Sequence, residues 1–156
     1  MMNLGFTEAL LAALASLLVV AAVIDVRSFT ISNKLNLAVA MLAPAFWWSS
    51  GLAPSGAAIQ IGVAAGVFAL LATAFYIGMM GGGDVKLAAA LALWFPPQAT
   101  LHFLVWMSVA GGVLTLFVLA AHKLRSRPGS PEVPYGVAIA IGGLAILAQR
   151  FLNQFA

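Results

Sequence analysis

The feature that most constrains this chain is the alternation of long apolar runs with short polar or Gly/Pro-containing breaks. Of its 156 residues, 63% are hydrophobic and only 7% are charged, whereas about a quarter of the residues of a soluble domain are charged. A helix that spans a bilayer needs about 20 mostly apolar residues. The sequence therefore predicts an all-α, polytopic membrane bundle of about six helices, formed by a single unit over 1–156.

The apolar runs predict where the six helices lie. They cover 5–25, 34–50, 56–79, 84–95, 97–121 and 134–153. The fourth run is short for a span, so its helix either begins earlier, in the glycines that precede it, or reaches only part of the way across the membrane. The first run has no basic start and exceeds the apolar core of a signal peptide, so we interpret it as a retained helix.

The Lys and Arg residues indicate how the helices are oriented. With six helices, the first, third and fifth breaks lie on one side of the membrane and hold six of the seven basic residues, Arg150 being the exception. The six are Arg27, Lys34, Lys86, Lys123, Arg125 and Arg127. Because Lys and Arg concentrate in cytoplasmic loops, we expect this side to face the cytoplasm and both termini to lie outside.

Composition excludes several function classes. The basic residues are scattered over short loops, whereas nucleic-acid binding requires a basic face or stripe. The chain has no cysteine, which excludes disulfides, thiolate zinc sites and a cysteine nucleophile. With only His102 and His122, a histidine-rich metal site is not expected either. We therefore expect no nucleic-acid partner, no metal and no cofactor.

Two of the four acidic residues stand beside apolar runs, Asp25 at the end of the first run and Asp84 after a glycine cluster. Ionisable groups at membrane depth are rare and mark functional sites. The predicted topology brings both acids to one membrane face. If the two carboxyl groups meet, with one ionised and the other protonated, they can activate water and protonate the reacting group. The pair then titrates as a unit, and the chemistry is that of an aspartic protease.

The residues around Asp84 favour a peptide-binding loop. Gly81, Gly82 and Gly83 permit backbone angles that other residues resist and allow an extended substrate strand to approach closely. Asp84 would then be an N-cap or first-turn residue of the fourth helix. Lys86 does not share a helical face with Asp84, so we expect it to contact lipid phosphates or a neighbouring loop.

A structural explanation exists for each of these residues. Asp25 could be an interfacial acid at a helix end, and Asp84 a helix cap after a glycine turn. Asn33 and Asn36 could cap the second helix. Glu132 could attract a basic peptide or simply be solvated. His102 is expected near the outer end of the fifth helix, far from the acids.

Three segments together resemble a known family. The stretch G-G-G-D-V-K-L is similar to the GxGD signature of intramembrane aspartyl proteases, in the version carried by prepilin peptidases. The stretch I-D-V-R-S-F-T-I-S-N-K-L-N resembles the first catalytic segment of that family, and V-P-Y-G-V-A-I-A-I-G-G resembles its third recurrent segment. Their order and spacing fit. The chain is most similar to the short peptidases that accompany tight-adherence (Flp) pili.

The resemblance implies roles for specific residues. Asp25 and Asp84 would be the catalytic pair, and Asn33 would make a hydrogen bond that shapes the site. Tyr135 and Gly136 would line the site, although an interfacial aromatic and a packing glycine explain them equally well, and Pro134 suits a helix start. The longer relatives carry a cysteine-containing insertion and many methylate their product. This chain lacks that insertion, so the resemblance implies neither zinc nor methyl transfer.

The implied substrate is a type IV pilin-like or pseudopilin precursor in the bacterial inner membrane, cut at the cytoplasmic face after a short basic leader. Three alternatives stay open. The chain could be a GxGD peptidase for another leader class, such as archaellin-type precursors. It could be a small proton-coupled transporter or channel, although these often have inverted repeats and acids near the bilayer midplane. It could also be a structural subunit of a larger membrane complex.

Overall fold

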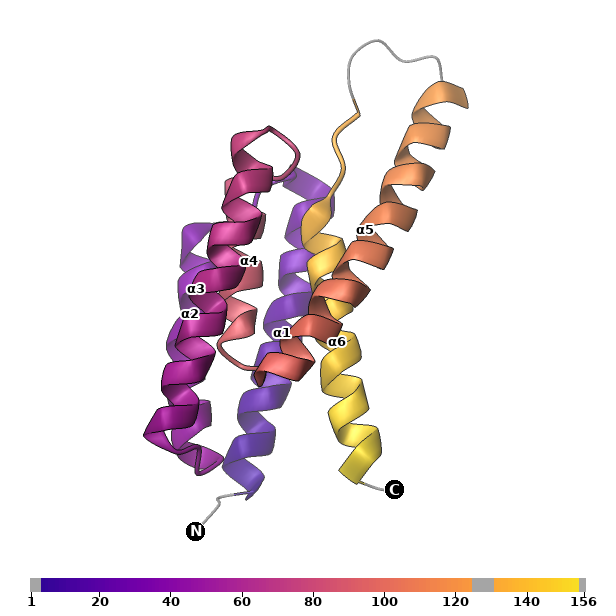
Figure 1. Cartoon of the computed structure of the whole chain (residues 1–156). Helices are drawn as coiled ribbons and strands as arrows, with labels where there is room; N and C mark the ends of the chain where they lie inside the picture. The colour runs from indigo at the N-terminus through magenta and orange to yellow at the C-terminus, as the bar shows by residue number, and fades with distance from the viewer. Residues whose placement is uncertain (1–3, 125–130, 155–156) are drawn as a thin grey trace.

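The computed structural model describes residues 4–124 and 131–154, and within these ranges the only regular elements are helices (Figure 1). There are six of them, as the sequence predicts, and the all-α fold is confirmed. The helices are α1 (Leu4–Ser28), α2 (Asn33–Ser49), α3 (Pro54–Tyr76), α4 (Gly82–Ala92), α5 (Pro97–Leu124) and α6 (Tyr135–Gln154). The predicted positions of Arg125 and Arg127 fall outside the described residues.

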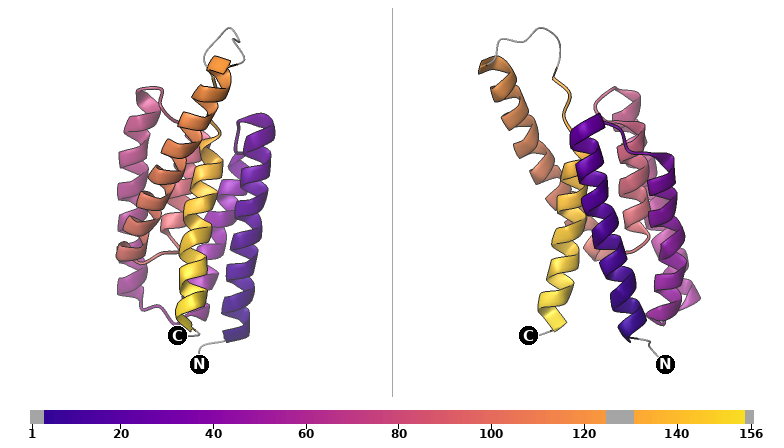
Figure 2. Two further views of the ribbon diagram at one scale, coloured as in Figure 1. Left: turned by 90° about the vertical axis from the view of Figure 1, so that its right-hand side faces the viewer. Right: turned by 180° about the vertical axis from the view of Figure 1, so that it is seen from behind.

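The helices run alternately up and down (Figures 1 and 2). The α1–α2 and α3–α4 connections, the end of α5 and the start of α6 all lie at one end, which we call the acid end because Asp25 and Asp84 lie there. The first and last described residues lie at the other end, the terminus end. Arg27 and Lys123 in the last turns of their helices, and Lys34 and Lys86 near the starts of theirs, all belong to the acid end.

Of the six described helices, four are long and apolar enough to cross a membrane, namely α1, α3, α5 and α6. Helix α2 has 17 residues, and α4 has only 11. At 1.5 Å per residue α4 is about 16 Å long, roughly half the hydrocarbon thickness. It therefore reaches only part of the way across, and it also begins in the glycines, two residues before Asp84. The chain is thus a membrane protein with one short helix inside its bundle.

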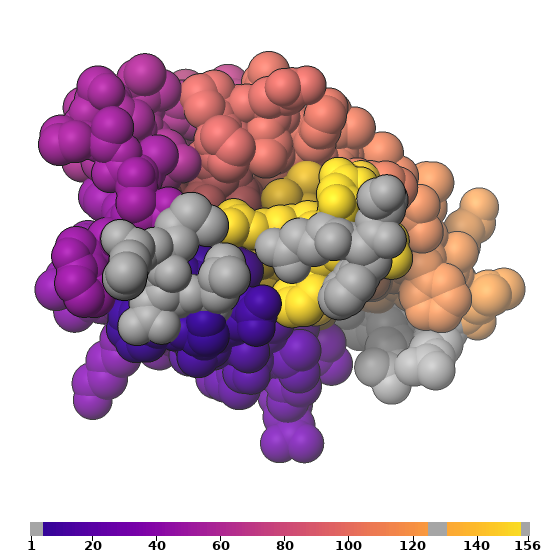
Figure 3. All heavy atoms as spheres, turned by 90° about the horizontal axis from the view of Figure 1, so that it is seen from below, coloured from indigo at the N-terminus to yellow at the C-terminus, as the bar shows by residue number. Residues whose placement is uncertain are grey.

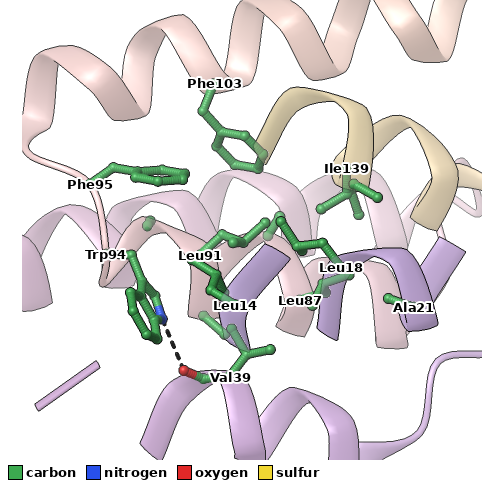
Figure 4. Close-up of a cluster of buried hydrophobic side chains, with 14 of the residues drawn as sticks. Leu14, Leu18, Ala21, Val39, Leu87, Leu91, Trp94, Phe95, Phe103 and Ile139 are labelled. Atoms are coloured by element: carbon green, nitrogen blue, oxygen red, sulfur yellow. Dashed lines mark hydrogen bonds between the residues drawn. The ribbon is translucent and has the colours of Figure 1, made fainter. Parts of the chain in front are cut away.

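The core lies where α1, α4 and α6 meet (Figure 4). Leu14 and Leu18 of α1, Leu87 and Leu91 of α4, and Ile139 of α6 are all fully buried. Glycines let α6 approach its neighbours. A Cβ at Gly143 would lie 2.8 Å from Leu18 Cδ1, which is too close for real carbon atoms. Small residues at helix contacts are typical of membrane bundles.

Helix α2 holds the short helix α4 at both ends. At the start of α4, Asn36 Nδ2 donates to the Gly83 carbonyl at 2.9 Å. Just past its end, Trp94 Nε1 donates to the Val39 carbonyl at 2.9 Å, drawn in Figure 4, and Trp47 Nε1 donates to the Leu93 carbonyl at 2.8 Å. These bonds fix the depth of α4 in the bundle and with it the position of Asp84.

Candidate active site

Asp25 lies one turn before the end of α1, with only 2% of its surface exposed. The helix continues to Ser28, so Asp25 does not end it as the apolar run suggested. Its Oδ2 accepts a hydrogen bond from the Val137 amide at 3.3 Å, and the Gly136 amide also faces the carboxylate. The Asp25 carboxylate therefore lies beside the N-terminus of α6, where free amides and the helix dipole favour a negative charge.

Gly136 explains how α6 can begin so close to Asp25. A Cβ at this position would lie 2.8 Å from Asp25 Oδ2 and 2.6 Å from Ile31 Cδ1. Both distances are shorter than real Cβ contacts, so only glycine fits without displacing its neighbours. The third segment singled out in the sequence thus contacts Asp25 through its backbone.

Asp84 is the third residue of α4, and the N-cap is Gly81. The first-turn interpretation is therefore correct and the N-cap interpretation is wrong. The Asp84 amide donates to the Gly81 carbonyl at 3.1 Å, and the Gly81 amide faces the Asp84 carboxylate. The second contact is one half of a capping box; the other half is missing because the N-cap, Gly81, has no side chain. Asp84 is 9% exposed, and its Oδ1 is buried without a hydrogen-bond partner.

The three glycines before Asp84 provide space, and the expectation that they supply unusual backbone angles is wrong. Gly81 has φ −73°, and the described glycines with positive φ are Gly51 and Gly78. A Cβ at Gly81 would lie 2.8 Å from Asp84 Oδ2, and one at Gly83 would lie 2.7 Å from the Ile31 carbonyl oxygen. The segment packed against Gly83 is therefore the chain's own α1–α2 connection.

Both acids line one cavity of about 520 Å³ at the acid end. Its wall comes from the end of α1, the α3–α4 connection and the segment before α6, including Thr30, Met80, Glu132 and Tyr135. Three of the four acidic residues of the chain thus line this cavity, and Asp25 lies close enough to Asp84 to act on it electrostatically. The fold brings together two carboxyl groups that are 59 positions apart in the sequence (84 − 25).

Asn33 and Lys86 are not among the residues that line this cavity. Both are exposed, and Lys86 Nζ donates to Asn33 Oδ1 at 2.8 Å. Of the two contacts expected for Lys86, lipid phosphates or a neighbouring loop, the structure shows the second, at the α1–α2 connection where α2 begins. The residue that sequence reasoning missed is Asn36, which is 5% exposed and bonded to Gly83. Its position on the buried stripe of α2 with Leu35, Val39 and Ala43 is the signal that could have revealed it.

The expected cap of α2 is also different. Ser32 is the N-cap, and its side chain accepts from the Leu35 amide at 3.3 Å. The suggestion that Asn33 or Asn36 caps this helix is therefore wrong. At α6 the expectation is nearly correct, because Pro134 is buried directly before the first helical residue, Tyr135.

The two histidines are not among the residues that line the cavity of Asp25 and Asp84. His102 lines a cavity at the terminus end, and His122 lies in the last turn of α5. Within residues 4–124 and 131–154, no group of three His, Cys, Asp or Glu side chains could hold a metal ion.

Comparison with protein families gives one match. The model of the type IV leader peptidase family matches residues 12–116, which is more than half of the chain and includes both Asp25 and Asp84. The segment that begins α6 lies beyond the matched region. A search of curated proteins found no match, and neither did a search of solved structures. On the family match, the chain belongs to the type IV leader peptidase family.

Proposed function

We propose that this membrane peptidase is an aspartic endopeptidase in which Asp25 and Asp84 are the catalytic pair. The observation that carries the proposal is that two buried carboxyl groups from different helices line one cavity, each beside the first turn of a helix. A family of leader peptidases requires a group that activates water, and the chain has no cysteine to serve as a nucleophile.

The chemistry needs one carboxylate and one carboxylic acid. The carboxylate takes a proton from water as the water oxygen attacks the carbonyl carbon of the scissile bond. The carboxylic acid donates its proton to the carbonyl oxygen. When the tetrahedral gem-diol collapses, the C–N bond breaks and the amine takes the proton that the pair holds. A hydroxyl of the intermediate returns its proton to the pair as the C=O bond of the new carboxyl group forms, so the two groups again share one proton. Because the pair titrates as a unit, we assign the shared proton to neither residue.

The position of the acids supports a substrate that enters from the membrane boundary. The Lys and Arg residues around the acid end favour a cytoplasmic location for it, with both termini on the other side. The glycine segment and Tyr135 border the same cavity, so an extended strand of the substrate can lie beside Asp84. Glu132 adds a third acid at the cavity wall, which suits a cationic leader. We propose a type IV pilin-like precursor of the bacterial inner membrane as the substrate.

The test is replacement of each acid. Asp25→Asn and Asp84→Asn keep the side-chain shape and remove the carboxyl group, and we expect either change to lower cleavage of a co-expressed pilin precursor at least about 100-fold. Glu8→Gln is the matched control, because Glu8 is an exposed acid of α1 near the terminus end. Mass spectrometry of the precursor reports the extent of cleavage and the cut site.

Full processing by either Asn variant would overturn the assignment of the pair. A panel that includes archaellin-type precursors tests the leader class, and cleavage of those alone would replace the pilin assignment. Ion flux in proteoliposomes without any leader cleavage would instead favour the transporter alternative.

A further inference from the structure

A second cavity, of about 430 Å³, lies at the terminus end, away from the acids. It exists because α4 is short. The α4–α5 turn lies within the length of the bundle, and α1 and α6 extend past it (Figure 1). The space below the turn is bordered by α1, the start of α5 and the end of α6. Figure 3 views the molecule from this end, with the end of α6 in yellow.

The wall of this cavity has an apolar part and a polar part. Leu11, Trp94, Phe95 and Leu147 form the apolar part, and all four are buried. The polar part comes from the start of α5 and the last turns of α6, where His102 and Arg150 face the same space. None of the described lining residues is acidic. A ligand that fits has an apolar chain and an anionic head.

Arg150 supplies the cation. Its guanidinium carbon lies 5.3 Å from the centre of the Phe46 ring, and that ring stacks on Trp94 with centroids 5.1 Å apart. Among the described residues, the Arg150 guanidinium has this cation–π contact and no ion pair with a carboxylate. The contact places the guanidinium over the face of the Phe46 ring, and no hydrogen bond from its N–H groups to another described residue is present, so these groups can bind a phosphate.

The start of α5 adds donors to the same space. The helix has 28 residues and begins at Pro97, so its first free amides belong to Gln98 and Ala99, which both line the cavity. Amides at a helix N-terminus bind anions, and the helix dipole favours negative charge there. An arginine, a histidine and these amides therefore border one cavity that also has an apolar wall.

We propose that this cavity binds the phosphoryl headgroup of an anionic phospholipid, with an acyl chain along the wall formed by Leu11 and Leu147. In the orientation proposed above, the lipid belongs to the outer leaflet. The site does not depend on the proposed catalytic pair, because it lies at the opposite end of the bundle.

The test is lipid binding to the purified, delipidated full chain, measured by native mass spectrometry. We expect phosphatidylglycerol to bind more tightly than phosphatidylcholine, and Arg150→Gln to weaken the tightest phosphatidylglycerol site about tenfold. Arg27→Gln is the matched control, since it removes an exposed arginine from a helix end at the acid end, and it should change this affinity less than about twofold.

A second pair of variants covers a failure of Arg150→Gln to fold. His102→Gln should weaken the same site about threefold, and Arg150→Lys should bind better than Arg150→Gln because it keeps the charge. Equal binding of phosphatidylglycerol by wild type, Arg150→Gln and His102→Gln would overturn the proposal. Equal affinity for phosphatidylcholine would also overturn it. So would binding of inorganic phosphate alone that is as tight as the binding of phosphatidylglycerol.

Discussion

At the acid end, α4 and α6 begin beside carboxylates of the chain itself, whereas at the terminus end α5 begins beside a cation and no described acid. Asp84 belongs to the first turn of α4, and Asp25 of α1 faces the first amides of α6. At the start of α5 the nearby charged group is Arg150. A helix N-terminus that already holds a carboxylate fixes that group in place, and one without an acid is free to bind an anion from outside.

The difference follows from the alternating direction of the helices. The even-numbered helices begin at the acid end. Helices α1 and α3 begin at the terminus end, and α5 begins part of the way along the bundle and runs toward the acid end (Figures 1 and 2). Three of the four acids line the cavity at the first end. Two membrane-embedded sites of opposite charge can therefore form in one small bundle, and each can be altered without touching the other.

The largest effect after removal of the acids themselves is expected from Gly136→Ala. The new Cβ would lie 2.6 Å from Ile31 Cδ1 and 2.8 Å from Asp25 Oδ2, so either these two side chains or the start of α6 must shift, and each shift changes the contact between α6 and Asp25. We expect precursor cleavage to fall about tenfold or more and the free energy of unfolding to fall by about 1–3 kcal/mol. A cleavage assay and thermal melting followed by tryptophan fluorescence measure the two effects.

Gly112→Ala is the control for this change. Gly112 also lies in a helix, but a Cβ there would meet nothing within 4 Å. The substitution should leave cleavage unchanged and raise stability by up to about 1 kcal/mol, because alanine loses less backbone entropy. Wild-type cleavage by Gly136→Ala would show that the contact between α6 and Asp25 is not needed.

An intermediate effect is expected from Asn36→Leu. Asn36 is buried, and the substitution removes its bond to the Gly83 carbonyl, which ties α2 to the start of α4. We expect a loss of stability of about 1–3 kcal/mol and a few-fold fall in cleavage as the start of α4 loosens around Asp84. For comparison, Asn33→Ala removes only an exposed hydrogen bond to Lys86 and should lower stability by less than about 1 kcal/mol. Equal melting temperatures of the two variants would contradict the idea that the Asn36 bond to Gly83 holds the start of α4 in place.

The smallest effect is expected at the other end of α4. Trp94→Phe removes a buried hydrogen bond to Val39, and Trp47→Phe removes a part-buried one to Leu93. We expect Trp94→Phe to lower stability by about 1–2 kcal/mol and Trp47→Phe by less, since Trp94 is fully buried and Trp47 only partly, so the smaller ring leaves more unfilled space at position 94. Melting of the two variants side by side measures the difference. The comparison of the two ends also predicts that Trp94→Phe weakens lipid binding more than it slows cleavage, and the reverse order would argue against separate sites.

Hydropathy and charge, read along the chain, determined the six helices, their order and the end at which both acids lie. These are local properties, because an apolar run of sufficient length forms a helix in a membrane wherever it packs. Because successive helices run in opposite directions, the end of the first helix, with Asp25, and the start of the fourth, with Asp84, lie at the same end of the bundle. The short fourth run indicated that its helix either begins earlier, in the glycines, or stops part of the way across, and the structure shows that α4 does both.

Only the tertiary structure decided which groups surround the acids. Asp25 meets an amide 112 positions away, at Val137, and Asn36 meets Gly83 across 47 positions. Local patterns carry no information on such pairs, which depend on how far each helix slides and turns against its neighbours. The same holds for the terminus-end cavity, because it arises from the depth at which α2 fixes α4. The glycines before Asp84 show the limit most clearly: their presence was informative, but the reason for them is the space taken by Ile31 and by Asp84 itself.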